Sequence, residues 1–146
     1  MQSIYQALTF RGYVEDPLSL SKLRFVSADV KATLGRLGLH SLWQLVEHGL
    51  TAKERRSLAE RAGLEEGVVL KLVRLADFCR VCDLELAELL VEAGAHTPFE
   101  LPLRPLDELC QMVLEATQRL GVNPPSREKL EEVKGKARML PPLFDY

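Results

Sequence analysis

Apolar residues recur along most of the chain at the three- and four-residue spacing of amphipathic α-helices, with polar residues between them. The stretch from 65 to 81 is the clearest, because Val69, Leu72 and Val73 lie on one helical face and Lys71 lies off it. The pattern predicts helices over residues 2–11, 19–25, 28–37, 42–48, 52–62, 66–80, 84–93, 98–101, 106–119 and 127–138.

Local signals at the ends of these segments support the prediction. Residues that can cap a helix N-terminus precede many of them: Ser27, Ser41, Thr51, Asp83, Thr97 and Ser126. Glycines follow many others, as expected after a helix C-terminus: Gly38, Gly49, Gly63, Gly94 and Gly121. Leucine greatly outnumbers valine and isoleucine together, which favours helices over strands. The sequence therefore predicts an all-α fold, a compact bundle of short helices.

The sequence also contains an internal repeat with a constant offset of 56 positions. The recurring residues are Leu34, Gly38, His40, Trp43 and Leu45, matched by Leu90, Gly94, His96, Phe99 and Leu101. Two copies, about 14–63 and 70–121, are too few for a solenoid, so each is expected to bury its apolar face against the other. We therefore predict a single all-α domain over residues 1–125, followed by a C-terminal helix and a proline-rich apolar tail over 126–146.

Composition and charge narrow the classes of partner and the cellular compartment expected for the protein. The 19 basic and 21 acidic residues give a net charge of −2, which weakens a nucleic-acid-binding interpretation because such domains are usually basic. The chain has three cysteines, no secretory signal and no apolar run of the roughly 20 residues that span a membrane. These features predict a cytoplasmic protein without a membrane partner.

Two stretches carry a family resemblance. The run LADFCRVCDLELAELLVEAGAHT from Leu75 to Thr97 and the run LAERAGL from Leu58 to Leu64 resemble an uncharacterised bacterial domain family built of tandem helix-hairpin-helix units. The resemblance covers roughly residues 14 to 121 and implies two degenerate units of this kind in a bacterial protein.

Such families usually carry a glycine-rich hairpin whose backbone amides can hold a DNA phosphate. The matching stretches here, 26–29 and 82–85, contain no glycine and place Asp29 and Asp83 where an anion would bind. The resemblance therefore implies the fold but not the phosphate site.

Basic residues of the first copy are the candidate nucleic-acid contacts. The candidates are Lys53, Arg55, Arg56 and Arg61 on one predicted helix, with Lys31 and Arg36 on another. They have two interpretations, a solvated helix face with nearby glutamates or a surface that contacts phosphates without reading bases. The second copy carries mostly acidic side chains and would repel a polyanion.

Other chemistry-bearing residues indicate no catalysis. Cys79 and Cys82 form a C-x-x-C pair, but no further ligands stand at a zinc-binding spacing and no strand precedes the pair as in a redox fold. His40 and His96 hold equivalent repeat positions after a glycine, which indicates a shared structural role at helix ends. We predict no enzyme activity, no metal and no cofactor.

The C-terminal tail is the candidate partner-binding segment, through Leu140, Leu143, Phe144 and Tyr146. Its prolines favour an extended chain, which either packs back on its own domain or docks on another molecule, as in a homodimer formed by tail exchange. The sequence thus predicts a non-enzymatic binding or scaffolding module with a protein partner. The alternative is weak, sequence-independent binding of DNA or RNA.

Overall fold

A computed structural model describes residues 18–146, and this part of the chain is helical, without a named strand. Its elements are η1 (Leu20–Lys22), α2 (Ala28–Arg36), α3 (Leu42–Val46), α4 (Ala52–Ala62), α5 (Glu66–Phe78), α6 (Leu84–Glu92), η2 (Pro98–Leu103), α7 (Leu106–Leu120) and α8 (Arg127–Arg138). An isolated bridge pairs Ser19 with Ser41. Among residues 18–146, no helix combines the length and the apolar character needed to cross a membrane. The all-α prediction is confirmed.

Predicted and observed helix boundaries agree closely along most of the described chain. The helices predicted over 52–62 and 127–138 have those bounds in the structure. The segment predicted over 19–25 keeps only one 3₁₀ turn, because the amides of Arg24 and Phe25 donate to a distant carboxylate instead of to helix carbonyls. The helix predicted over 2–11 lies outside the described residues.

Side-chain caps start several helices as expected. Ser27, Thr51, Asp83 and Ser126 each accept from the backbone amide three residues later. Gly38, Gly63, Gly94 and Gly121 have positive φ, as helix-ending glycines do.

The expectation that Gly49 is a left-handed glycine at a helix end is wrong. This glycine has no positive φ, and an added Cβ would lie 2.6 Å from the Val73 side chain. Glycine is therefore needed at position 49 for the close approach of the chain after α3 to α5, and not for a left-handed helix end.

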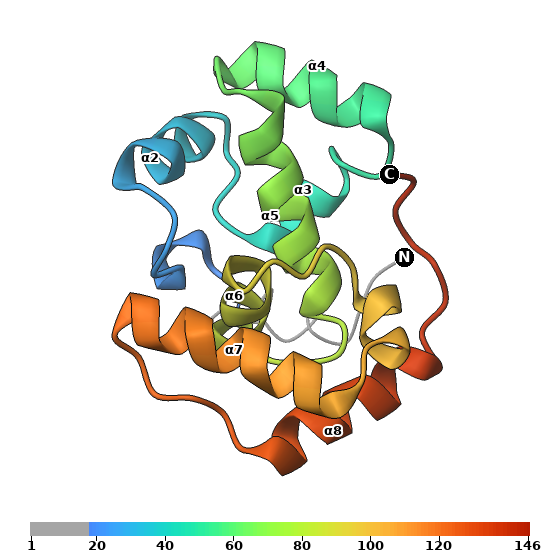
Figure 1. The fold of residues 1–146 in the computed structure, drawn as a ribbon. Coiled ribbons are helices and arrows are strands. Elements are labelled where there is room, and N and C mark those ends of the chain that lie inside the picture. The colour runs from blue at the N-terminus through green and yellow to red at the C-terminus, as the bar shows by residue number, and fades with distance from the viewer. Residues whose placement is uncertain (1–17) are drawn as a thin grey trace, which may run out of the picture.

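The hydrophobic core surrounds α5, which runs through the centre of the molecule (Figure 1). This helix packs against α3, α4 and α6, and its residues Leu72, Leu75 and Phe78 are almost fully buried. Helix α8 packs across η2 and α7 and adds Leu130 and Val133 to the same core. The segment 126–146, set apart in the sequence prediction, thus shares the core of the preceding domain.

Several local hydrogen bonds recur at the offset of 56 positions. Helices α2 and α6 begin at Ala28 and Leu84. After each helix, the amide of the residue following the glycine returns to a helix carbonyl: Leu39 to Leu34, and Ala95 to Leu90. The repeated sequence positions therefore make matching local contacts.

Candidate functional site

The segment between η1 and α2, residues 23–27, is called the first turn. It is held by Glu88 of α6, whose carboxylate accepts from the amides of Arg24 at 2.8 Å and Phe25 at 2.9 Å. Glu88 is only 2% exposed, although it is a charged residue. Two backbone amides that could have bound an external anion are therefore occupied by a carboxylate from the protein itself.

A second polar contact fixes the same turn. Lys71 of α5 donates to the Phe25 carbonyl at 3.2 Å and to Glu92 of α6 at 2.6 Å. The first turn is thus tied through its amides and a carbonyl to residues more than 40 positions away in the sequence. These contacts connect the two halves of the molecule.

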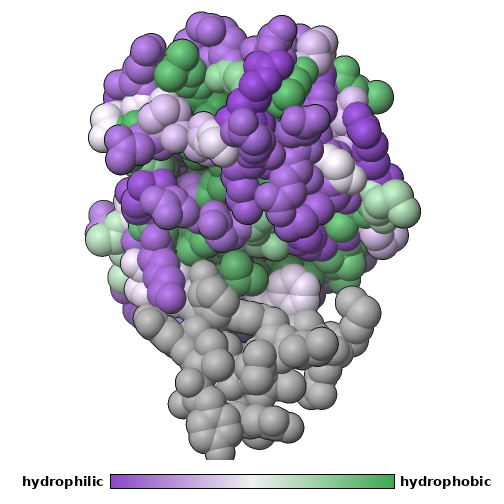
Figure 2. Space-filling model, turned by 90° about the horizontal axis from the view of Figure 1, so that it is seen from below, coloured by the Kyte–Doolittle hydropathy of each residue, from purple (hydrophilic) through white to green (hydrophobic). Residues whose placement is uncertain are grey.

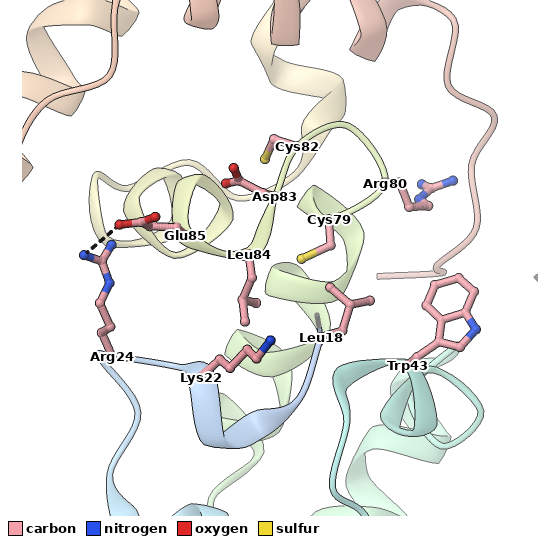
Figure 3. A pocket seen from close by; sticks show the side chains of 10 residues that line it. All are labelled: Leu18, Lys22, Arg24, Trp43, Cys79, Arg80, Cys82, Asp83, Leu84 and Glu85. Carbon is pink, nitrogen blue, oxygen red and sulfur yellow. Dashed lines mark ion pairs between the residues drawn. The ribbon is translucent and has the colours of Figure 1, made fainter. Parts of the chain in front are cut away.

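The segment between α5 and α6, residues 79–83, is called the second turn, and it borders a pocket of about 700 Å³. The pocket is lined by Leu18, Lys22, Arg24, Trp43, Cys79, Arg80, Cys82, Asp83, Leu84 and Glu85. Leu18, Cys79 and Leu84 lie in the middle of this lining, with Trp43 at one end (Figure 3). At the other end Arg24 and Glu85 form an ion pair at 3.3 Å. The pocket therefore has an apolar floor and a charged rim.

Both cysteines of the C-x-x-C pair lie in this pocket as free thiols. Burial raises the pKa of Cys79 strongly, and the nearby Cys82 and Asp83 raise it further. Burial, followed by Asp83, raises the pKa of Cys82 to about 12. The Cys82 thiol donates to the Phe78 carbonyl at 3.3 Å. Both side chains are therefore protonated near neutral pH, a state that disfavours nucleophilic and metal-binding chemistry.

Residues 139–146, called the tail, run without helical structure from the end of α8 along one side of the molecule to a point near the start of α4 (Figure 1). Asp77 of α5 is fully buried, and it accepts from the Arg80 guanidinium at 2.5 Å and from the Tyr146 hydroxyl at 2.8 Å. Arg80 also donates to the Pro141 carbonyl at 2.7 Å. Asp77 thus contacts the last residue of the tail, and Arg80, which is bound to Asp77, contacts Pro141 near the start of the tail.

Arg55 of α4 supplies the second anchor. Its guanidinium donates to the carbonyls of Gly49 and Asp145, both at 2.8 Å, and lies 5.4 Å from the centre of the Tyr146 ring. The Asp145 amide in turn donates to the Leu50 carbonyl at 2.7 Å. We call Leu50, Arg55, Asp77 and Arg80 together the tail site.

The other predicted tail residues fit this arrangement to different extents. Phe144 is buried and 8% exposed, and Leu140 and Leu143 pack partly against the core. Tyr146 remains 44% exposed, although its hydroxyl bonds to Asp77. In this structure the four residues contact the domain that carries them.

One residue of the predicted basic patch, Arg55, is buried and does not belong to the exposed surface of α4. Arg55 is 5% exposed and serves the tail, so it does not join the exposed Lys53, Arg56 and Arg61 of α4. The burial of Arg55 could have been predicted from the sequence, because position 55 shares a helical face with Leu58 and Ala59, which are buried.

Four of the other candidate cations, Arg56, Arg61, Lys31 and Arg36, have partners within the protein. Arg56 pairs with Glu66 at 3.5 Å, and Arg61 lies 3.4 Å from the ring of His48. On α2, Lys31 donates to the Leu23 carbonyl at 2.6 Å and Arg36 to Thr33 at 3.1 Å.

Within residues 18–146, no group of three or more His, Cys, Asp or Glu side chains could hold a metal ion. His40 and His96 make equivalent contacts through their backbone amides, which donate to the side chains of Gln44 and Glu100. Seen from below, the described surface is largely hydrophilic, with hydrophobic side chains between the polar ones (Figure 2).

Comparison with known proteins identifies a family. No curated protein and no solved structure shows significant similarity to the chain. Residues 25–140 match the family described as "Domain of unknown function (DUF4332)". This match begins in the first turn and ends in the tail, so it includes Glu88, Asp77 and most of the pocket lining. Because the match covers well over half of the chain, the protein belongs to this family of domains of unknown function.

Proposed function

We propose that this protein is a non-enzymatic protein-binding module whose tail site recognises an extended, proline-led segment ending in aromatic residues. The observation that carries the proposal is the way the site holds its own tail. Arg80 and Arg55 donate to the backbone carbonyls of Pro141 and Asp145, and Asp77 accepts from the Tyr146 hydroxyl. A partner segment with the same spacing would meet the same donors and acceptor.

Two features make these contacts suited to recognition of a peptide. Bonds to backbone carbonyls tolerate different side chains, whereas the burial of Phe144 and the hydroxyl of Tyr146 select aromatic residues. Pro141 and Pro142 restrict the unbound segment, so less conformational entropy is lost when it is ordered. The sequence resemblance implies a helix-hairpin-helix-like fold whose degenerate hairpins have lost the usual phosphate-binding glycines. In such a fold, the tail site would be the binding surface in place of the hairpins.

A peptide titration tests this proposal. A full-length chain with Phe144→Ser and Tyr146→Ser should release its tail and bind a labelled peptide of residues 139–146, measured by fluorescence anisotropy. The wild-type chain should bind this peptide at least about tenfold more weakly, because its tethered tail competes at a high effective concentration.

Two controls accompany the titration. A peptide with alanine at positions 144 and 146 should not bind. A chain with Leu103→Ser, an 84% exposed residue outside the tail site, should behave as the wild type. Absence of binding at millimolar peptide by a variant that still unfolds cooperatively would contradict the proposal.

The alternative is weak, sequence-independent binding of nucleic acid, favoured by the exposed Lys53, Arg56 and Arg61 on α4. The acidic second copy and the internal use of the first-turn amides by Glu88 oppose it. If it holds, anisotropy with labelled DNA should show binding that weakens steeply with salt and falls when these three cations become alanine. Arg55 is left unchanged in that test, because its loss would disturb the tail instead.

A further inference from the structure

We propose that the partner segment bound at the tail site carries a carboxylate beside its tyrosine, and that Arg74 of α5 is the residue that selects this carboxylate. The inference rests on the proposed function, because it names the chemistry of the ligand that the same site would take. The chain's own tail leaves Arg74 without a partner, and a ligand with one more negative charge would supply it.

Arg74 is a half-buried arginine on α5, three positions before Asp77. Its Nε atom is buried without a hydrogen-bond partner, and its guanidinium makes no ion pair within residues 18–146. The guanidinium lies close enough to Tyr146 to act on it through its charge. Burial raises the pKa of Tyr146 most and Asp77 raises it further, whereas Arg74 and Arg55 lower it. A partly desolvated cation beside the tyrosine of the tail therefore lacks a counter-ion.

The charge balance at this surface favours an acidic ligand. The tail site and Arg74 together contain three guanidiniums, those of Arg55, Arg74 and Arg80, and one carboxylate, that of Asp77. The tail brings one charged side chain, Asp145, which is exposed and contacts the site through its backbone amide and carbonyl. A ligand with a further carboxylate near Arg74 would therefore gain an ion pair that the tail does not make.

Asp77 restricts where this negative charge can lie. Its carboxylate is fully buried and accepts from the Tyr146 hydroxyl at 2.8 Å. A phosphate on that hydroxyl would bring two negative groups into contact in a buried site and would break the hydrogen bond. The added charge therefore belongs to a residue beside the tyrosine, so that the hydroxyl still binds Asp77.

The same charge explains how a partner could displace the tail. The tail is tethered to the domain, so its effective concentration at the site is high. A partner that makes only the contacts of the tail would therefore compete poorly. A partner that also pairs with Arg74 has an interaction that the tail lacks, and this difference favours the partner.

Two synthetic peptides with blocked ends test the inference. Both contain residues 139–146, and one is extended by two glutamates while the other is extended by two glutamines. The receptor is the full chain with Phe144→Ser and Tyr146→Ser, and binding is measured by fluorescence anisotropy at low salt. The glutamate peptide should bind about fivefold or more tightly than the glutamine peptide, because an ion pair is added. In the same receptor with Arg74→Gln, the two peptides should bind equally.

Two further variants of this receptor serve as controls. Arg56→Gln removes an exposed arginine of α4 that pairs with Glu66 at 3.5 Å and lies outside the tail site, so it should leave the advantage of the glutamate peptide unchanged. Arg74→Met removes the charge but keeps an apolar side chain of similar length, and it replaces Arg74→Gln if that variant does not unfold cooperatively.

The possible outcomes separate this inference from the proposed function. If neither peptide binds the receptor, both the proposed function and the inference fail. If both peptides bind equally to the receptor with native Arg74, the site binds the segment without selecting a carboxylate, and the inference alone is overturned. The inference is also overturned if the advantage of the glutamate peptide survives the loss of the Arg74 charge.

Discussion

Replacement of Glu88 by alanine is expected to lower the free energy of unfolding by about 2–4 kcal/mol. The carboxylate is 2% exposed and accepts from the amides of Arg24 and Phe25. Its removal leaves two amides without their acceptor and opens a space beside α6. Glu88→Gln should have an intermediate effect, because the amide oxygen can accept one hydrogen bond and the NH₂ group would face the other donor.

Glu85 provides the matched control for this prediction. It lies on the same helix one turn earlier, its side chain is 74% exposed, and its ion pair with Arg24 is at 3.3 Å. Glu85→Ala should change the free energy of unfolding by less than about 1 kcal/mol, because exposed ion pairs contribute little. Urea unfolding followed by circular dichroism measures both variants. Equal values for the two would show that Glu88 does not hold the halves together.

Replacement of Asp77 by alanine is expected to lower the free energy of unfolding by about 3–5 kcal/mol, as found when one partner of a buried ion pair is removed. Asp77 is fully buried and binds both Arg80 and Tyr146. Without it, the Arg80 guanidinium stays mostly buried without its carboxylate, and the tail loses its terminal contact. Tyr146→Phe removes only the hydroxyl and should lower the free energy by about 1 kcal/mol.

A double-mutant cycle separates the two contributions of Asp77. If the Tyr146 hydroxyl acts through this carboxylate, Tyr146→Phe should have almost no further effect in an Asp77→Ala background. Full additivity in denaturant unfolding would contradict the contact.

The tail contact also predicts a dependence on pH. Burial, with Asp77 nearby, raises the pKa of Tyr146 above its ordinary value. The folded chain therefore holds the proton of the Tyr146 hydroxyl more tightly than the unfolded chain does, so the protonated form of this side chain stabilises the fold. The contribution should be complete below about pH 10, where tyrosine in the unfolded chain is protonated, and should decline at higher pH. Tyr146→Phe should lose this decline.

Helix positions in this protein were predictable because they depend on neighbours in the sequence. Thr51 caps the start of α4, Gly63 ends the same helix, and Ser126 caps the start of α8. These positions were predictable because caps and left-handed glycines act over three or four residues. The repeated positions around Gly38 and Gly94 follow the same local rules.

The candidate sites were predicted less completely. The sequence indicated the tail as a binding segment, but it placed Arg55 on a solvated face, and Asp77 and Glu88 carried no recognisable motif. Arg55 could have been assigned to the buried face from its spacing to Leu58. Asp77 and Glu88 could not, because a carboxylate on a helix is normally solvated unless distant groups satisfy it.

One physical cause explains why the sequence predicted some features of this protein and only the tertiary structure determined others. The sequence alone was enough for most of the described helices, for most of their ends and for the matched positions of the two copies, because these depend on backbone hydrogen bonds and apolar spacing over a few residues. Tertiary packing alone decided that Glu88 reaches the first turn 63 and 64 positions away, and that Tyr146 reaches Asp77 69 positions away. Whether a buried charge is stabilising depends on the partners that the fold brings to it, and those partners are not its sequence neighbours.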